Sequence, residues 1–333
     1  MSNRILEIGN LKTYFFTVRG VVKAVDGISF GLRKGENLCL VGESGCGKTA
    51  TALSILRLID SPPGRIVDGE IVYHGEDLLK CSDDKMRQIR GNRIAMVFQD
   101  PQSSLNPVLT VGDQIMEQIK LHLRLNHKSA IERTVQLMEQ AGIPQASERM
   151  KDYPHQFSGG MKQRVMIAAA LSCDPEILIA DEPTTALDTT IKAQILDIFR
   201  DLKQKKNMSI LFITHDMGTV AGIADRIVVM YGGRVAEVGN VLDIFDQPKH
   251  PYTIGLLNCL PDISTRKDRL TPIPGMIPSL IDPPEGCNFS PRCQWRMPVC
   301  DQKRPEHFVI SEGHLAACYL YSESATSEKA ILR

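Results

Sequence analysis

Residues 42–49, GESGCGKT, have the types and the spacing of a loop that binds phosphate. The pattern is G-x-x-x-x-G-K-T, in which backbone N–H groups surround the phosphates. An apolar run at 38–41 precedes the loop, and apolar residues recur at helical spacing over 52–59. A strand, a glycine-rich turn and a helix N-terminus together predict a nucleotide site. We expect Lys48 to reach the β- and γ-phosphates and the Thr49 hydroxyl to bind Mg²⁺.

Two carboxylates at the end of another apolar run would supply the second half of such a site. Residues 177–183, ILIADEP, predict a strand that ends at Asp181 and Glu182. A Mg²⁺–nucleotide site needs one acidic group near the metal and another group that orients the attacking water. We therefore expect Asp181 beside the metal and Glu182 beside the water.

A second anion site is predicted at residues 157–164, FSGGMKQR, directly before an apolar helical pattern. A Ser-Gly-Gly turn at a helix start exposes backbone N–H groups at the positive end of the helix dipole. The chain thus has two helix starts that can bind phosphate, whereas a single nucleotide needs only one.

These segments, together with ADEPTTALD at 180–188, resemble the ATP-binding cassette family over about residues 1–245. In that family two cassettes face head to tail, and each Ser-Gly-Gly turn closes over the ATP held by the partner's phosphate loop. The resemblance therefore accounts for the second anion site. It implies that the ATP of this chain is bound by Gly42, Ser44, Gly45, Cys46, Gly47, Lys48, Thr49, Ala50 and Asp181. It implies that the partner's ATP meets Ser158, Gly159, Gly160 and Asp188.

Two more positions match the family's catalytic pattern. Gln99 follows an expected strand at 94–98, and the resemblance implies that it senses the γ-phosphate, the metal or the water. His215 follows an expected strand at 209–214, SILFIT, and would bond the γ-phosphate and hold Glu182. The implied catalytic set is Glu182, His215 and Gln99. The implied Mg²⁺ ligands are Thr49, Gln99 and Asp181.

The resemblance also implies an aromatic side chain that stacks on the adenine. Phe15, in LKTYFF, would stack on the adenine, with Tyr14 as the alternative because the register of this strand is ambiguous.

The phosphate loop departs from the family pattern at one position. Ala50 stands where a hydroxyl residue often follows Thr49. Backbone donors therefore have to replace one side-chain contact to the phosphates.

Four cysteines near the C-terminus have the spacing C-x5-C-x6-C-x17-C: Cys287, Cys293, Cys300 and Cys318. Structural zinc sites usually draw ligands from C-x2–4-C pairs, and this block contains none. Wider loops suit a [4Fe–4S] cluster, whose usual ligands are four thiolates, while zinc and unligated cysteines are the alternatives. The block lies outside the residues matched to the ATP site. We expect metal ligation to stabilise a tail with a small apolar core and not to do redox chemistry at that site.

The C-terminal region carries a narrower resemblance. Residues 250–257, HPYTIGLL, residues 272–280, PIPGMIPSL, and the cysteine block resemble the C-terminal extension of dipeptide/oligopeptide permease ATPase subunits. In those subunits the block looks like an iron–sulfur site. The resemblance implies ATP-driven import of peptides, fed by an extracellular or periplasmic substrate-binding protein. Some relatives import nickel or oligosaccharides, and these cargoes are the alternatives.

Strand and helix patterns that alternate along the chain predict a mainly parallel sheet. With the resemblance, the expected class is α/β: an ABC-type ATPase with a RecA-like, mainly parallel core sheet. An N-terminal antiparallel β subdomain, a helical insert and a small Cys-rich C-terminal extension complete it. The expected segments are the nucleotide-binding core with the β subdomain and phosphate loop (1–99), the helical subdomain with the signature turn (100–170), the continued core (171–245) and the extension with the four-cysteine site (246–333).

The composition is that of a soluble protein with a substantial core. The chain has 333 residues, 43% of them hydrophobic, with 39 acidic and 39 basic side chains, so there is no net basic field for nucleic acid. The N-terminus breaks its apolar residues too early for a signal peptide. No apolar run approaches the roughly 20 residues needed to span a bilayer. We expect a peripheral protein at the cytoplasmic face of the cell membrane, where disulfides are rare.

The spacing of the motifs excludes several classes of cassette protein. Lys48 and Ser158 are 110 residues apart, which leaves no room for a long coiled coil, and there is one cassette without a fused membrane span. What remains is a separate transporter ATPase. Its expected partners are a second ATPase subunit (a paralogue or itself), two transmembrane permease subunits and the substrate-binding protein. We expect docking near Gln99 and the helical insert. A soluble ATP-driven switch acting on nucleic acid is the distant alternative.

Overall fold

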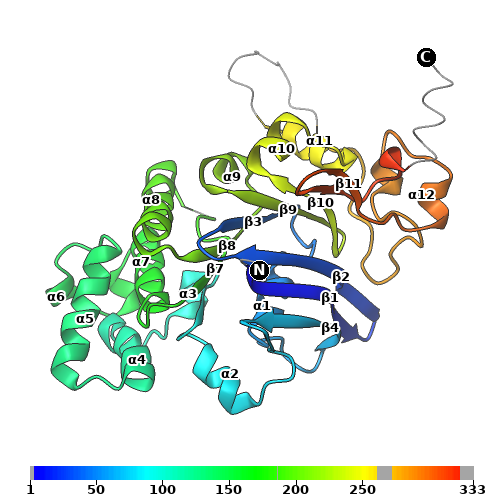
Figure 1. The fold of residues 1–333 in the computed structure, drawn as a ribbon. Helices are drawn as coiled ribbons and strands as arrows, with labels where there is room; N and C mark the ends of the chain where they lie inside the picture. Colours follow the sequence, from blue (N-terminus) through cyan, green and yellow to red (C-terminus); the bar gives the residue numbers. More distant parts are fainter. Residues whose placement is uncertain (1–3, 186, 261–271, 323–333) are drawn as a thin grey trace. The chain divides into compact units, whose positions relative to one another are not determined.

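The computed structural model describes residues 4–185, 187–260 and 272–322 (Figure 1). Part of the expected C-terminal extension, 261–271 and 323–333, lies outside these ranges. The chain divides into two units, and each is described by itself. We call residues 33–37 and 80–213 the helical unit, and residues 4–32, 38–79 and 214–333 the sheet unit.

The sheet unit contains the expected N-terminal antiparallel sheet, with strand order β2-β1-β4-β5. Its strands are β1 (Arg4–Thr17), β2 (Gly20–Arg33), β4 (Gly64–Tyr73) and β5 (Glu76–Asp77). Strand β1 pairs with β4 from Leu6↔Tyr73 to Phe15↔Gly64, with register shifts on both sides of Lys12. Such irregularities change which face successive side chains take, and they explain why the sequence pattern left the register of β1 ambiguous.

A second sheet in this unit carries the phosphate loop. Strand β3 (Asn37–Val41) is fully buried and lies parallel to β9 (Arg226–Tyr231). Strand β10 (Arg234–Asn240) then pairs antiparallel with β9. The alternating strand and helix patterns predicted a mainly parallel sheet, whereas β9 and β10 form an antiparallel hairpin. Gly232 and Gly233 make the turn with φ of 54° and 80°, which glycine adopts readily.

The C-terminal residues extend this sheet. Strand β12 (His314–Ala316) pairs antiparallel with β10, and β11 (Phe308–Ser311) pairs antiparallel with β12. The helices of the sheet unit are α1 (Lys48–Ile55), α9 (Met217–Ile223), α10 (Val241–Asp246), α11 (Pro251–Asn258) and α12 (Val299–Gln302). Two short 3₁₀ turns, η2 (Ser290–Arg292) and η3 (Tyr319–Tyr321), lie in the C-terminal segment drawn in orange to red in Figure 1.

The helical unit combines a parallel sheet with the predicted helical insert. Strands β6 (Ile94–Val97), β7 (Ile177–Asp181) and β8 (Ser209–Thr214) are parallel, with β7 in the middle. All residues of β7 and β8 are buried, as the apolar runs predicted. The helices are α2 (Asp83–Ile89), α3 (Pro101–Ser104), α4 (Val111–Leu123), α5 (His127–Gln140), α6 (Ala146–Arg149), α7 (Gly159–Ala170) and α8 (Thr189–Lys206), with the 3₁₀ turn η1 (Pro154–Gln156).

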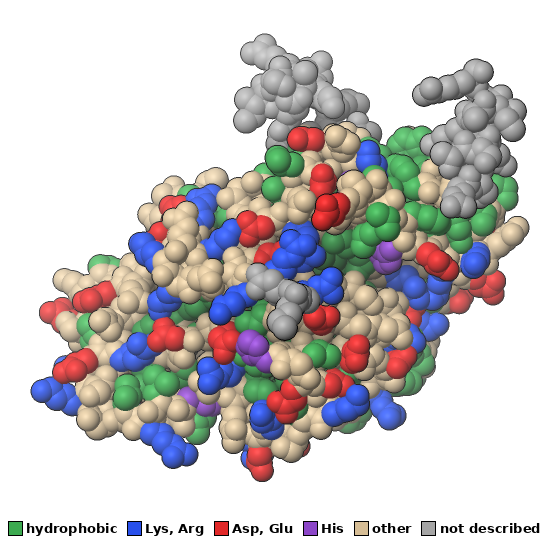
Figure 2. Space-filling model, in the orientation of Figure 1, with side chains coloured by type: hydrophobic (Ala, Val, Ile, Leu, Met, Phe, Trp, Pro, Cys, Tyr) green, Lys and Arg blue, Asp and Glu red, His purple; other side chains and the backbone are tan. Residues whose placement is uncertain are grey.

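Charged side chains of both signs lie interspersed on the face of the protein in Figure 2. Among the helices of the described ranges, none combines the length and the hydropathy needed to cross a membrane.

Candidate ATP site

The phosphate loop joins β3 to α1, and its glycines hold a backbone that other residues would not adopt. Gly47 begins α1 with a φ of 105°, and a Cβ there would lie 2.2 Å from the Ala24 carbonyl oxygen. Gly45 has a φ of 80°, and apart from its chain neighbours no heavy atom of the described residues lies within 4 Å of where its Cβ would be. The loop is therefore closed on the protein side and open where a phosphate would approach.

Lys48 lies inside the curve of this loop with only 5% of its surface exposed. Its Nζ donates to the carbonyl oxygens of Gly42 at 2.8 Å and Glu43 at 3.1 Å. The buried Cys46 thiol lies 3.9 Å from the same Nζ, and burial raises the pKa of that thiol despite the nearby ammonium. A buried ammonium beside a row of backbone donors is suited to bind a polyphosphate.

The other predicted residues of the loop differ in their exposure. Ser44, Gly45 and Thr49 are exposed, and Ala50 is half-buried. The first helix ends at Ile55, so Ile59 lies beyond it, although the apolar spacing predicted a longer helix.

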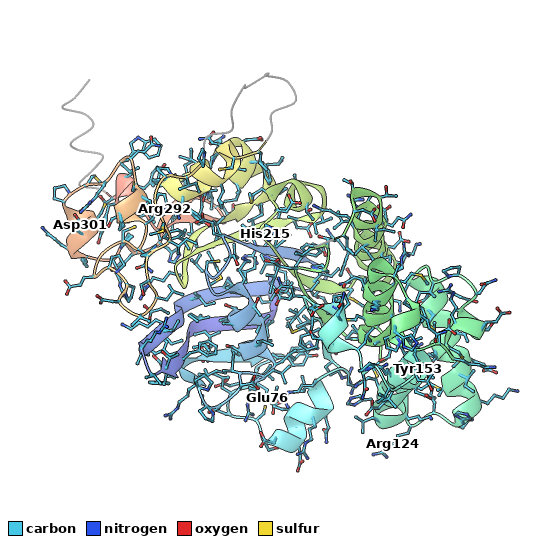
Figure 3. The ribbon with its side chains drawn as sticks, turned by 180° about the vertical axis from the view of Figure 1, so that it is seen from behind. Glu76, Arg124, Tyr153, His215, Arg292 and Asp301 are labelled. Atoms are coloured by element: carbon cyan, nitrogen blue, oxygen red, sulfur yellow. The ribbon has the colours of Figure 1, made fainter. Side chains whose placement is uncertain are left out.

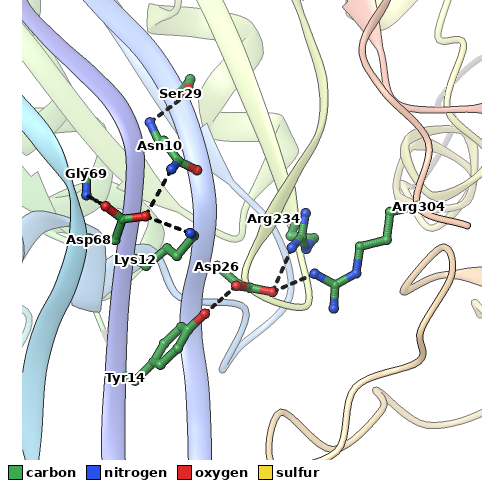
Figure 4. Close-up of polar contacts among 9 residues, drawn as sticks. All are labelled: Asn10, Lys12, Tyr14, Asp26, Ser29, Asp68, Gly69, Arg234 and Arg304. Atoms are coloured by element: carbon green, nitrogen blue, oxygen red, sulfur yellow. Dashed lines mark hydrogen bonds and ion pairs between the residues drawn. The ribbon is translucent and has the colours of Figure 1, made fainter.

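Two neighbouring aromatic residues of β1 point to different surroundings. The Tyr14 hydroxyl donates to Asp26 Oδ1 at 2.7 Å, and burial together with this bond raises the pKa of Tyr14 to about 12. Figure 4 shows Arg234 and Arg304 reaching the same carboxylate. The Tyr14 hydroxyl is thus engaged by Asp26.

Phe15 lies on the opposite side of β1. The Thr13 hydroxyl, two residues earlier, is 2.7 Å from the Ser54 hydroxyl of α1, the helix that follows the phosphate loop. Alternate residues of a strand share a face, so Phe15 is on the α1 side with Thr13. Its ring packs over Gly64, 2.9 Å from where a Cβ on that glycine would lie. This orientation favours Phe15 over Tyr14 for the adenine contact.

In the helical unit, Glu182 follows β7 and its carboxylate is held by two donors. Gln99 Nε2 donates to Glu182 Oε2 at 3.3 Å, and the Thr185 hydroxyl donates to the same oxygen at 2.9 Å. The backbone N–H of Glu182 donates to Ile213 of β8 at 2.9 Å. Its φ is 46°, a left-handed conformation that costs free energy in a non-glycine residue and is common at functional sites.

Glu182 is 8% exposed and Asp181, the last residue of β7, is 1% exposed. A carboxylate that is nearly buried, and whose orientation is set by Gln99 and Thr185, can orient a water for attack on a phosphate.

The Ser-Gly-Gly turn is an exposed helix start in the same unit. Ser158 caps α7, its hydroxyl accepting from the Met161 N–H at 3.4 Å. Asp188 caps α8 by accepting from the Ile191 N–H at 2.9 Å. The Ile191 side chain lies 2.6 Å from where a Cβ on Gly160 would be, so the two helix starts pack together.

Ser158, Gly159 and Asp188 are exposed, and a Cβ on Gly159 would meet no atom within 4 Å. This anion site is therefore accessible from outside the unit that forms it.

The structure brings some predicted residues together within one unit and places others in different units. Gln99 and Glu182 are in contact within the helical unit, which also contains Asp181. The sheet unit contains the phosphate loop, Phe15 and His215. His215 is exposed and follows β8 directly (Figure 3).

The four cysteines of the C-terminal block line one small cavity, together with His250, Phe289 and Tyr319 among others. None of the cysteines in the described ranges forms a disulfide. Burial raises the pKa of Cys287 to about 11 and that of Cys318 to about 12. Among the described side chains, no three His, Cys, Asp or Glu groups are placed to hold a single metal ion.

Sequence reasoning missed one set of contacts at the phosphate loop. Arg292 of the cysteine block donates to both carboxylate oxygens of Glu43, at 2.8 and 3.2 Å. The Tyr252 hydroxyl accepts from the Glu43 N–H at 2.8 Å. No short motif in the sequence signals these contacts, because Glu43 and Arg292 are 249 residues apart.

Comparison with known proteins agrees with this geometry along the whole chain. A family model described as "ABC transporter" matches residues 25–185, and one described as "Oligopeptide/dipeptide transporter, C-terminal region" matches residues 236–300. The dipeptide transport ATP-binding protein DppD of Bacillus subtilis (strain 168) is 49% identical over 99% of this chain and 98% of its own length. The oligopeptide transport ATP-binding protein AppD of the same organism is 48% identical over 97% of this chain and 99% of its own.

Solved structures agree on the fold. A bacterial ABC transporter cassette solved as a dimer superposes with a TM-score of 0.64 at 25% identity, covering 71% of this chain and 98% of that one. The phosphate loop, the oriented Glu182 and the C-terminal region thus match one family together. The chain belongs to the ABC transporter family, as an ATP-hydrolysing subunit of its oligopeptide/dipeptide group.

Proposed function

We propose that this chain hydrolyses ATP to power the import of dipeptides or oligopeptides. The observation that carries this proposal is the near full-length identity of 47–49% to proteins named for dipeptide or oligopeptide transport. The identity extends over the C-terminal region, which is not part of the ATP-hydrolysing core. Nickel or oligosaccharide remains the alternative cargo, because no described residue has been assigned a contact with cargo.

The contacts of Lys48 and Glu182 support the catalytic roles proposed for them. Lys48, already inside the loop, would bind the β- and γ-phosphates, and the open space over Gly45 would admit them. Glu182, oriented by Gln99, would polarise the attacking water, while His215 would bond the γ-phosphate and hold Glu182. Phe15 would stack on the adenine, since the Tyr14 hydroxyl is engaged by Asp26.

Thr49, Gln99 and Asp181 offer oxygen ligands, which suit Mg²⁺. When bound, that ion would neutralise charge between the phosphates.

We assign the active unit as a dimer of cassettes. The turn of Ser158, Gly159 and Gly160, in which Ser158 and Gly159 are exposed, would close over the partner's ATP with Asp188 beside it. The partner is a paralogous subunit or a second copy, since this chain has both a phosphate loop and a signature turn. Two transmembrane permease subunits would bind near Gln99 and the helical insert, at the cytoplasmic face of the membrane. A substrate-binding protein would deliver the peptide from the other side.

We assign the four segments of the chain to the parts of such an ATPase. Residues 1–99 and 171–245 would form the nucleotide-binding core, 100–170 the helical subdomain and 246–333 the extension.

For the extension we propose a structural [4Fe–4S] cluster held by the four cysteines. All four cysteines line one cavity. Burial raises the pKa of the Cys287, Cys293 and Cys318 thiols, and nearby backbone N–H groups lower it in part. Ligation by iron would favour the thiolates that burial disfavours. Anaerobic purification tests this: brown protein with about four irons per chain supports it, while colourless protein with one zinc supports a zinc site instead.

The transport function is tested by purifying the chain with what it binds in its native host. Membrane subunits should co-purify, and ATP hydrolysis by the reconstituted complex should rise when a substrate-binding protein loaded with a di- or tripeptide is added. The same protein loaded with Ni²⁺ or an oligosaccharide should not stimulate. Stimulation by one of those ligands and not by peptide would contradict the peptide assignment.

A further inference from the structure

The Glu43 carboxylate is an unexpected group in a loop built to bind phosphate. It follows Gly42 directly, and its backbone carbonyl oxygen accepts from Lys48 Nζ at 3.1 Å. A negative charge at this place would repel the phosphates of a nucleotide unless another group neutralised it. Within the sheet unit, that group is Arg292.

The contact between Arg292 and Glu43 is close, bidentate and largely buried. The two guanidinium nitrogens donate to the two carboxylate oxygens at 2.8 and 3.2 Å. The Arg292 side chain is 4% exposed and that of Glu43 is 27% exposed. Paired N–H donors in this geometry fix the position of a carboxylate as well as its charge.

Arg292 is itself held rigidly on its other sides. Its Nε donates to the Pro274 carbonyl oxygen at 2.9 Å, and a terminal nitrogen donates to the Tyr231 hydroxyl at 3.3 Å. The guanidinium also lies over the rings of Tyr231 and Phe289, 5.7 and 6.0 Å from their centroids. Burial alone would lower the pKa of Arg292, but the bonds to Glu43 and Tyr231 raise it, so the cation stays charged.

The position of Arg292 in the chain connects this pair to the cysteine block. Arg292 is the last residue of η2, and Cys293 follows it directly. The backbone around it is tied to other cysteines, since the Ser290 N–H donates to the Cys287 carbonyl oxygen and the Cys287 N–H to that of Cys300. Figure 3 marks Arg292 in this C-terminal segment, which also contains Asp301. A displacement of the Cys287–Cys293 loop would therefore move the guanidinium.

We propose that Arg292 is a positioning residue of the phosphate loop, through which the four-cysteine block sets the affinity for ATP. The guanidinium neutralises Glu43 and holds its carboxylate to the side, which leaves the loop's backbone donors to the phosphates. The inference rests on the proposed role of the loop in ATP binding. Loss of order in the cysteine block would release Glu43 and weaken nucleotide binding.

A double-mutant cycle on the full chain tests the pair, with dissociation constants for nucleotides as the readout. Arg292→Met keeps the length and the apolar contacts with Tyr231 and Phe289 but leaves the Glu43 carboxylate without its cation. ATP affinity should fall at least about tenfold, because at an effective dielectric near 20 two like unit charges cost a factor of ten even when they are about 12 Å apart. The loss should be smaller for ADP and smaller again for AMP, which carry less charge.

The other variants of the cycle should not lose affinity. Glu43→Gln removes the negative charge, so ATP should bind at least as tightly as it does to the wild type. The combination of Glu43→Gln with Arg292→Met should restore most of the affinity that Arg292→Met lost. If both single changes weaken binding and the double change is additive, Arg292 has only a structural role and the proposal is wrong.

Two further variants keep the test decisive if Arg292→Met folds poorly. Arg292→Lys retains a cation and should keep most of the ATP affinity. Arg296→Met removes an arginine of the same block whose bidentate pair with Asp301, at 2.7–3.0 Å, is exposed, so it removes a cation without displacing the Cys287–Cys293 loop or contacting Glu43. ATP affinity should be unchanged in this control. An equal loss in Arg296→Met and Arg292→Met would overturn the proposal.

The effect of the cysteine block on ATP binding is tested by placing one cysteine variant in two different chains. Cys293→Ser should weaken ATP binding several-fold in the wild-type chain and have no effect in the Glu43→Gln/Arg292→Met chain, where no pair remains to be broken. Equal weakening in both chains would show that the block does not act through this pair. Lys48→Ala separates this failure from failure of the ATP site, because it should weaken ATP binding whatever the role of Arg292.

Discussion

The phosphate loop and the Ser-Gly-Gly turn are both glycine-containing helix starts, yet the structure treats them in opposite ways. The phosphate loop has internal partners: Lys48 bonds its carbonyl oxygens, Gly233 donates to Cys46, and Tyr252 and Arg292 hold Glu43. The Ser-Gly-Gly turn is exposed, and nothing described approaches Gly159. A loop that encloses its own lysine can be complete in one chain, whereas a helix start whose Ser158 and Gly159 are exposed is suited to a ligand carried by another molecule.

The strongest test of this contrast is Glu182→Gln. The amide keeps the size of the side chain but cannot act as a base, and we expect ATP turnover to fall at least about 100-fold while ATP binding persists. Size-exclusion chromatography with ATP and Mg²⁺ should then show a dimer closed over uncleaved nucleotide. Near-normal turnover would contradict the assigned role of Glu182.

Lys48→Ala and Ser158→Arg should separate the two anion sites. Lys48→Ala removes hydrogen bonds between charged groups, worth about 1.5–3 kcal/mol, so the isolated chain should bind ATP about 10- to 100-fold more weakly. Ser158→Arg should leave that binding unchanged and abolish turnover only in the partner's site. In mixtures of Ser158→Arg with Glu182→Gln chains, activity should depend on which chain carries which change. Hydrolysis that is indifferent to this arrangement would exclude a shared site.

The smallest expected effect is that of Tyr14→Phe, which tests the choice of the adenine contact. It removes one hydrogen bond to Asp26, which keeps Arg234 and Arg304, so the free energy of unfolding should fall by about 1 kcal/mol. Adenine binding should be unaffected, while Phe15→Ala should weaken it. The reverse result would reassign the adenine contact to Tyr14.

The loss of stability in Tyr14→Phe should also depend on pH in a defined direction. Burial would raise the pKa of Asp26, but the bonds from Tyr14 and Arg234 outweigh it and lower that pKa below its usual value. A lowered folded-state pKa stabilises the protein above the unfolded-state value and loses that effect as the pH falls. The difference between wild type and variant, measured by denaturant unfolding, should therefore persist at neutral pH and shrink in acid.

The sequence predicted well those elements whose signal is local. The runs at 177–181 and 209–214 became β7 and β8, as expected for apolar segments that are short and contain β-branched residues. The sequence predicted strand register and strand direction less well, because local backbone geometry determines them. The register shifts around Lys12 determine whether Tyr14 or Phe15 faces α1, and the Gly232–Gly233 turn converts an expected parallel arrangement into an antiparallel hairpin.

The candidate site likewise contains residues that the sequence predicted and residues that it did not. Residue types and spacing located Gln99 and Glu182, which the structure places in contact. The pair of Glu43 and Arg292 spans 249 residues and matches no short motif, so only the folded chain reveals it.

The pairing of β12 with β10 has a consequence for handling the protein. Without residues 308–316, the outer edge of β10 would present unpaired N–H and C=O groups, which are a template for association with other chains. Glu237 of β10, fully buried, would at the same time lose its bond to His314 Nε2 at 2.7 Å. A shortened cassette that ends near residue 245 would thus be prone to aggregate. The extension is therefore a structural part of this sheet, because its strands pair with the edge of β10.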